Sequence, residues 1–430
     1  MNHYRLNFLV LIFIASTPGL IAAESGSVGA SLTVSLSEAE QAMLRHNPQL
    51  RSKDYDIQAS SAQLSQDKRY DNPNISSMYN VYNPSNKRYF DTSRNGEIDL
   101  QIEQPIAIGG QHKEKVRESQ AMTESSKYNR KDTERQLLQQ LDEKFIELYY
   151  LQKENHIYEK ENLSLEKIHQ AYQEQMEKGN IPELEVQRIE NMHFQLLQEQ
   201  QELLTSEKDL EKDIRLLTGL PEDKNILPVI NDRQIISSLS SVLNLKELLA
   251  MAQSRPDIIA QNYNIQASEH EVKLQKAKAL PQVSLQGEYD KNGNIGHNYF
   301  GVGVGLSIPI FDHNKGNIKV AEIQSRQAQL DQETNRQQIE ADIRQNFSQL
   351  FLDKKIVDEA DGKFSNSIDD LINQAELQYM KRNISMLEFL DLYTSYKDSY
   401  IAINESKKRL LDSAVNMNAL VGSNIIKLNY

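Results

Sequence analysis

The feature that most constrains this chain is a long internal repeat. Three pairs of segments carry it: 46–60 and 254–268, 178–185 and 381–388, and 217–219 and 420–422. Pro48 matches Pro256 at a spacing of 208 residues. A period this long indicates two copies of one structural unit rather than a solenoid of short repeats. We therefore predict two units, residues 24–220 and 245–430, joined by a linker or equatorial region at 221–244 that holds two prolines and a serine run.

The chain begins with a predicted secretory signal over residues 1–23. Arg5 supplies a short positive region, Leu6 to Ile14 form an apolar core, and Ala22-Ala23 offer a small-residue cleavage site. This apolar run is too short to span a bilayer as a helix, and an uncleaved anchor is the alternative interpretation. No later segment approaches the ~20 apolar residues of a membrane helix. Such an exported chain would be periplasmic, secreted or an outer-membrane barrel.

Composition excludes several classes of function. The chain has no cysteine, which excludes disulfides, thiol metal sites and a lipid-bearing N-terminal cysteine. A formal charge of -13 argues against nucleic acid as a partner, because phosphates would repel it. No nucleophile elbow, phosphate loop or His-Glu-x-x-His motif is present, and the histidines are scattered singly, as on a solvated surface. We therefore expect no catalytic residue, no cofactor, no metal site and no enzymatic activity.

Each unit contains two stretches of alternating polarity that predict β-strands. The four strands are expected at about 73–82, 97–107, 281–290 and 299–310, with polar, flexible loops at 83–95 and 290–298. Strands of about ten residues can cross a bilayer when tilted. Four strands cannot close a barrel, and an open edge cannot remain in lipid, so closure would need several copies of the chain. The alternative is a soluble hairpin with one buried face.

The remaining pattern predicts very long helices. Residues 111–177 contain neither Pro nor Gly and would form a helix of about 100 Å. The return helix, 183–218, carries Ile189, Leu196, Leu203, Leu210 and Leu217 at intervals of seven. Helices at 314–380 and 386–420 are their counterparts, and 36–69 forms a first helix with Ser37 as N-cap and Pro48 as an interruption. A plain periplasmic coiled-coil rod would explain the heptads but not the strands.

The informative polar residues lie at the turns between the long helices. The first turn is Gly179-Asn180-Ile181-Pro182 and the second is Arg382-Asn383-Ile384-Ser385, with Ser385 a predicted N-cap. Acids follow at once: Glu183 and Glu185 in the first unit, Glu388 and Asp391 in the second. Acids at a helix N-terminus stabilise its dipole, which is one interpretation. In a symmetric oligomer the same acids would form rings of charge that select and gate, which is the other.

The ordered set of strand pair, long helix, tip with acids and duplication closely resembles the TolC-type outer membrane factors. The most specific pieces are 104–111, 172–188, 307–311 and 379–393. The Gly-Gly-Gln junction at 109–111 looks most like the heavy-metal efflux branch of that family. The resemblance implies an α+β membrane protein in which a long antiparallel coiled-coil tunnel continues a trimeric twelve-stranded outer-membrane β-barrel, with four strands from each chain.

The resemblance also implies function. It predicts a passive exit duct, a homotrimer in outer-membrane lipid, whose periplasmic tips meet an adaptor protein and, through it, an inner-membrane pump of the RND type. Metal cations or small toxic compounds are the implied substrates. The family's gating carboxylates fall on Glu388 and Asp391, with Glu185 in the first unit. Arg382 replaces the glycine usual at the second tip and puts the tip geometry in doubt. The rivals are a type I protein secretion channel and a soluble periplasmic adaptor or scaffold.

Overall fold

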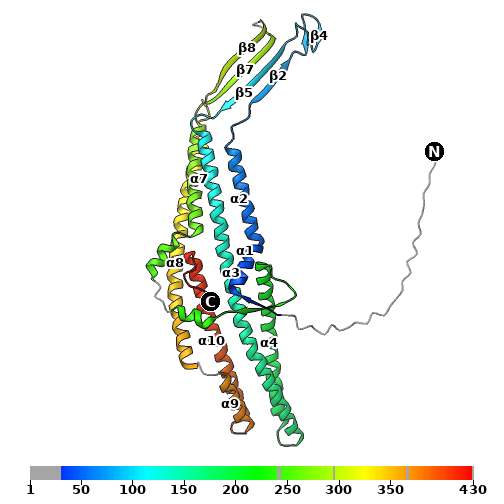
Figure 1. Cartoon of the computed structure of the whole chain (residues 1–430), viewed down its shortest axis with the longest axis vertical. Helices are drawn as coiled ribbons and strands as arrows, with labels where there is room; N and C mark the ends of the chain where they lie inside the picture. Colours follow the sequence, from blue (N-terminus) through cyan, green and yellow to red (C-terminus); the bar gives the residue numbers. More distant parts are fainter. Residues whose placement is uncertain (1–30, 240–243, 294–295, 365–367, 429–430) are drawn as a thin grey trace, which may run out of the picture.

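The computed structural model describes residues 31–239, 244–293, 296–364 and 368–428, so the predicted signal at 1–23 lies outside the described residues. The molecule is a long rod (Figure 1), with a β-sheet at one end and two helical tips at the other. The α+β class predicted from the sequence is confirmed. Among the described residues, no helix combines the length and apolar character that a bilayer crossing requires.

The first unit begins with a short strand and two helices. Strand β1 (Ser31–Ser35) leads into α1 (Leu36–His46) and α2 (Pro48–Asp67). The N-cap of α1 is Ser35, not the predicted Ser37, because Ser35 and Glu38 form a reciprocal capping box. The break expected at Pro48 is present, and the side chain of Asn47 caps α2 there.

Two very long helices complete the first unit. Helix α3 (Gln111–Glu177) runs from the sheet to the tip, and α4 (Glu183–Thr218) returns from it. Gly109 and Gly110 both take positive φ at the junction of strand and helix. A Cβ on Gly109 would lie 2.3 Å from Leu280 Cδ1, so this position admits no larger residue without a shift. The heptad leucines and Ile189 of α4 are buried, as their period predicts.

The second unit repeats this order. It contains α6 (Leu245–Ala252), α7 (Pro256–Lys278), β7 (Gln282–Gly293), β8 (Gly296–Ser307), α8 (Lys315–Phe364), α9 (Ile368–Met380) and α10 (Met386–Val421). The loop predicted at 290–298 is wrong, because β7 and β8 pair as far as Gly293 and Gly296. Strand β8 also ends before the predicted residue 310, since Pro309 has no N–H to extend the ladder.

The sheet joins the two units. Its strand order is β2-β5-β7-β8, all antiparallel, with β2 at Asn74–Tyr79 and β5 at Ile98–Ile106. The loop at 83–95 is more ordered than predicted: β3 (Tyr82–Asn83) and β4 (Arg88–Tyr89) pair within this region, and the carboxylate of Asp91 accepts bonds from Asn83, Asn86 and the amide of Ser93.

One face of this sheet is apolar and open. The register places Ile75, Ile102, Gly287 and Val302 in one row across the four strands. Val302 is 97% exposed, and Phe300, Val304 and Leu306 on the same strand are also exposed. The row beside it is polar: Ser76, Gln101, Glu288 and Gly301. A sheet with its apolar side chains outward is the arrangement of a strand in lipid, not of a soluble hairpin with one buried face.

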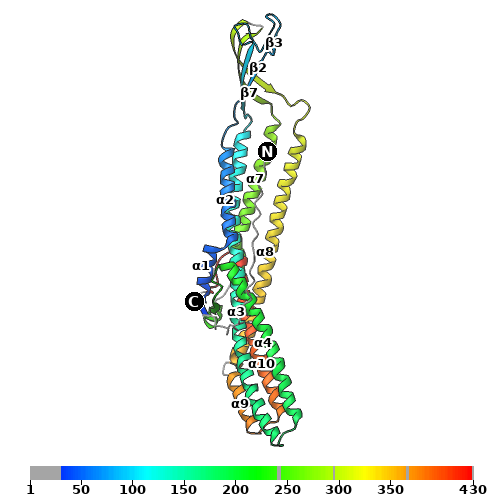
Figure 2. The same ribbon diagram turned by 90° about the vertical axis from the view of Figure 1, so that its right-hand side faces the viewer.

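The equatorial region predicted at 221–244 contains regular structure over residues 225–238. Strand β6 (Asn225–Val229) pairs in parallel with β1, and α5 (Asp232–Ser238) follows. Ile226 and Ile235 are buried in the main hydrophobic core, which also includes Leu141, Phe145 and Leu148 of α3. In Figure 2 this equatorial region lies at the middle of the rod, beside α1 and α3.

Candidate gate at the helical tips

The two tips have the same backbone although their sequences differ. Gly179 has φ 76° and its counterpart Arg382 has φ 57°, both left-handed. At the first tip the amide of Asn180 donates to the Gln175 carbonyl at 2.9 Å. The amide of Asn383 donates to the Gln378 carbonyl at the same distance. The replacement of glycine by Arg382 therefore leaves the turn geometry unchanged, at the cost of backbone strain.

The helices that leave the tips begin differently. Pro182 is the N-cap of α4 and offers no side-chain bond, whereas Ser385 caps α10 as predicted. The hydroxyl of Ser385 accepts from the Glu388 amide at 3.3 Å, and Glu388 Oε2 accepts from the Ser385 amide at 2.8 Å. The bonds from the backbone and the hydroxyl of Ser385 lower the pKa of Glu388. The Glu388 carboxylate is thus engaged in a capping box within its own chain.

The three predicted gate acids are not equivalent in the folded chain. Glu185 is half-buried and lies near the hydroxyls of Tyr172 and Tyr379, whose pKa values are raised mainly by burial and also by the charge of Glu185. Asp391 is exposed one turn beyond Glu388 and has no hydrogen bond or ion pair with any part of the chain that the structure describes. Asp391 is therefore the acid free to face a pore or another copy. Within one chain, no hydrogen bond or ion pair joins Glu185 to either acid of the second tip among the described residues.

An aromatic ladder, defined as Tyr172, Tyr379, Phe389 and Tyr393, holds the two tips together. Tyr172 of α3 stacks on Tyr379 of α9 with centroids 5.5 Å apart. Tyr379 stacks on Phe389 at 4.6 Å, and Phe389 meets Tyr393 at 5.3 Å. Phe389 and Tyr393 are almost completely buried. Sequence reasoning missed this ladder, although Phe389 and Tyr393 share a helix face four residues apart.

Sequence reasoning also missed a buried acid above the ladder. Glu161 of α3 is 1% exposed, and neither carboxyl oxygen has a hydrogen-bond donor in the described part of the chain. The signal was available, because Glu161 stands four residues after Ile157 and four before Leu165, in the apolar seam. The expectation that the histidines are all solvated singly is wrong for His270, which is half-buried and bonds Glu114 at 2.7 Å.

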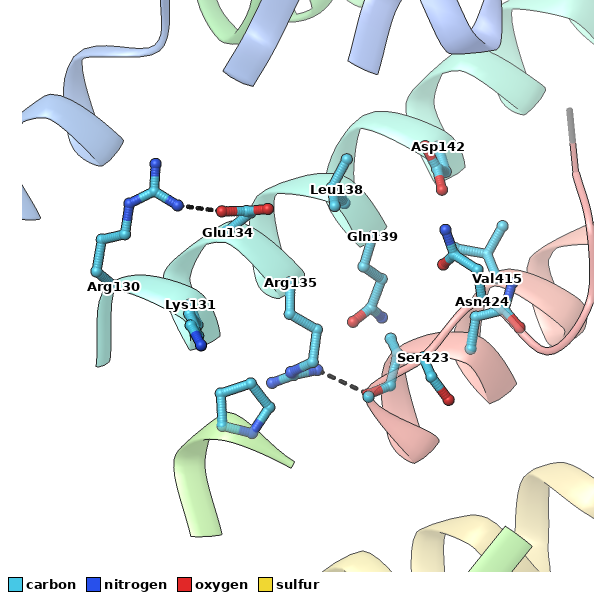
Figure 3. Close-up of a pocket in the computed structure, with 14 residues that line it drawn as sticks. Arg130, Lys131, Glu134, Arg135, Leu138, Gln139, Asp142, Val415, Ser423 and Asn424 are labelled. Atoms are coloured by element: carbon cyan, nitrogen blue, oxygen red, sulfur yellow. Dashed lines mark hydrogen bonds and ion pairs between the residues drawn. The ribbon is translucent and has the colours of Figure 1, made fainter. Parts of the chain in front are cut away.

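A second candidate is a pocket of about 350 Å³ at the equator (Figure 3), between α3 and the C-terminal segment. Its arginines are already paired: Arg130 with Glu134, and Arg135 with the Ala419 carbonyl at 3.0 Å. Burial raises the pKa of Asp142, which lies at one end of the pocket. Arg130 and Arg135 are thus committed to partners within the chain rather than free for a ligand. Within the described ranges, no group of three or more His, Asp or Glu side chains could hold a metal ion.

The comparisons agree with this architecture. The sequence model of the family described as outer membrane efflux protein matches residues 40–220 and 249–423. The chain therefore belongs to the outer membrane efflux protein family, whose members are passive channels of the outer membrane rather than enzymes. The helical rod is its periplasmic part. A comparison of the sequence with curated proteins gives no match.

Solved structures show the same fold at low identity. The Campylobacter jejuni CmeC outer membrane channel has a TM-score of 0.75 at 17% identity, over 90% of this chain and 86% of that one. CusC has a TM-score of 0.75 at 14% identity, over 93% and 96%. The open state of the Neisseria gonorrhoeae MtrE outer membrane channel has a TM-score of 0.71 at 15% identity, over 91% and 89%.

Proposed function

We propose that three copies of this chain form the outer-membrane exit duct of a tripartite efflux system. The observation that carries this proposal is the four-stranded sheet with an apolar outer face and two free edges, β2 and β8. An unpaired edge is costly in lipid, because its backbone groups find no partner there. Pairing β8 of one copy with β2 of the next removes every edge, and three copies supply the twelve strands of a closed barrel.

The oligomer can be tested directly. The mature protein extracted from outer membranes in detergent should have the mass of three chains by light scattering. A Val302→Lys variant places a charge on the lipid-facing row and should reduce membrane insertion, whereas Gln101→Lys on the polar row of the same sheet should be tolerated. A monomer that stays soluble without detergent would overturn the proposal.

The proposed partners are supported by the position of the tips. A rod that carries its tips away from the sheet would present them to a periplasmic adaptor, and the adaptor would connect them to an inner-membrane pump of the RND type. All the turn residues are exposed except Ile181 and Ile384, which are half-buried. The proposed adaptor contacts are the turns themselves: Gly179, Asn180, Ile181 and Pro182 in the first tip, and Arg382, Asn383, Ile384 and Ser385 in the second.

The proposed substrate class is narrower than membership of the family implies. Metal cations or small toxic compounds are supported by the net charge of -13 and by the Gly-Gly-Gln junction at 109–111. Deleting the gene and profiling sensitivity to metals, dyes and antibiotics tests this. Increased sensitivity to one of these classes would support the proposal and identify the substrate. Loss of an exported protein without any gain in sensitivity would instead indicate a type I protein secretion channel.

The gate is proposed at Glu185, Glu388 and Asp391, which three-fold symmetry would repeat around the pore axis. Rings of like charge select and repel, so their removal should change both aperture and ion preference. We expect the Glu388→Gln, Asp391→Asn double variant to raise single-channel conductance in planar bilayers and to weaken cation preference. Glu183→Gln is the matched control, because Glu183 is an exposed first-turn acid outside the gate. Equal conductance in wild type, double variant and control would overturn the assignment of Glu388 and Asp391 to a gate.

A further inference from the structure

The buried acid Glu161 lies between the two helical hairpins, with charged neighbours on both. Lys397 of α10 is its main cationic neighbour, while Glu199 of α4 and Asp398 of α10 oppose a negative charge there. On one side lies a pocket of about 280 Å³, to which Lys160 and Lys167 of α3 and Glu376 of α9 also contribute.

Lys397 is committed to a different acid. Its Nζ donates to Glu199 Oε2 at 2.6 Å and stands 5.3 Å from the ring centroid of Tyr158. The Tyr158 hydroxyl donates to the same oxygen at 3.2 Å. A charged Glu161 would compete with Glu199 for Lys397, whereas a neutral Glu161 would not. The arrangement therefore has two alternative pairings for one cation.

Glu161 also acts on the aromatic ladder. Burial is the main cause of the raised pKa of Tyr393, and the charge of Glu161 adds to it, which places the carboxyl near that ring. Tyr393 packs on Phe389, and Phe389 lies on α10 between the gate acids Glu388 and Asp391. A change at Glu161 can thus reach the gate through two packed rings.

The protonation state of Glu161 is sensitive near neutral pH. Burial is the largest effect and raises the pKa of Glu161 to about 8, against the opposing effect of Lys397. Because this pKa lies above the value of 4.5 for a free glutamate, the fold favours the protonated form. The stability that this preference contributes is fully present below about pH 4.5 and is lost as the pH rises from there through about 8.

We propose that Glu161 is a proton-controlled positioning residue for the gate: neutral Glu161 keeps α10 packed on α3, and its ionisation loosens the second tip. This inference rests on the proposed function of the tips as a gate. A buried carboxylate without a donor is costly, so ionisation favours a conformation that admits water or Lys397. The tips would then separate at alkaline pH and close at acidic pH.

Spin-label distances test this in the intact trimer. The chain has no cysteine, so Asn383→Cys gives one label at each second tip. Between about pH 6 and about pH 9.5 we expect the distances to lengthen, with a midpoint near the pKa of Glu161. Glu161→Gln should hold the short distances throughout, while Glu166→Gln, exposed on the same helix, should behave as wild type.

A second variant keeps the test decisive even if Glu161→Gln fails to fold. Lys397→Met removes the cation that lowers the pKa of Glu161, so the midpoint of the distance change should move to higher pH. An unchanged midpoint in Lys397→Met overturns the proposal, and so does a pH response that persists in Glu161→Gln.

The experiments distinguish the proposed role of Glu161 from the proposed gate, because either can be overturned without the other. If the distances do not respond to pH but the Glu388→Gln, Asp391→Asn variant still raises conductance, the role of Glu161 is overturned and the gate stands. If the distances respond but the conductance of that variant never changes, the gate assignment fails instead.

Discussion

The first and second tips have one backbone and two different ways of holding it. The first uses Gly179 for the left-handed residue and leaves its next helix without a side-chain cap. The second places Arg382 in the same conformation and adds the capping box of Ser385 and Glu388. The backbone of the first tip is therefore unstrained, but its next helix lacks a side-chain cap. The second tip carries backbone strain at Arg382, and its next helix is stabilised by the capping box.

The difference also separates the roles of the three acids in the proposed gate. Glu388 already serves the start of α10, so neutralising it alters the helix as well as the pore. Asp391 has no such structural role among the described contacts, and Glu185 lies near the tyrosine hydroxyls of the ladder. Duplication has preserved the position of an acid at each tip but not its role.

The largest expected difference between the tips is in packing. Phe389→Ala should lower the local unfolding free energy of α10 by about 3–5 kcal/mol, because it removes a fully buried ring. Its counterpart Val186→Ala removes only two methyl groups and should cost about 1.6 kcal/mol. Hydrogen exchange of the amides after each tip measures both. Equal losses at the two tips would contradict the assignment of the ladder to the second.

The difference in helix capping between the two tips should affect stability less than the difference in packing. Ser385→Ala removes the hydroxyl that accepts from the Glu388 amide and should cost about 1 kcal/mol. Pro182→Ala, at the matching position, removes no side-chain bond and should change stability by a few tenths of a kcal/mol. Exchange rates in the first turns of α10 and α4 report the two values. A Pro182→Ala effect as large as that of Ser385→Ala would contradict the difference in capping.

Much of the fold could be predicted because its signals are local. Alternation indicated the strands, and the absence of Pro and Gly after Gly110 indicated α3. The pairing of β1 with β6 escaped prediction because parallel partners far apart in sequence leave no local pattern. The N-cap at Ser35 could have been found, since Ser35 and Glu38 have capping-box spacing.

The candidate site was only partly predictable, because some of its features depend on local sequence and others on contacts between distant segments. The turn residues and acids of the tips follow from local spacing, and so does the cap at Ser385. The stacking of Tyr172 on Tyr379 depends on which faces of two distant helices meet, and no local pattern specifies that. The burial of Glu161 depends on the same packing, although its position among the apolar residues of α3 indicated that it could be buried.

The smallest expected difference concerns backbone strain. Arg382→Gly should stabilise the second tip by about 0.5 kcal/mol, because relief of the left-handed penalty slightly exceeds the entropy that glycine loses on folding. Gly179→Arg should destabilise the first tip by a similar amount, since it introduces the same penalty there. Exchange of the Asn383 and Asn180 amides measures the two turns. If Arg382→Gly destabilised the second tip, the arginine side chain would have to make a contribution there that outweighs its backbone strain.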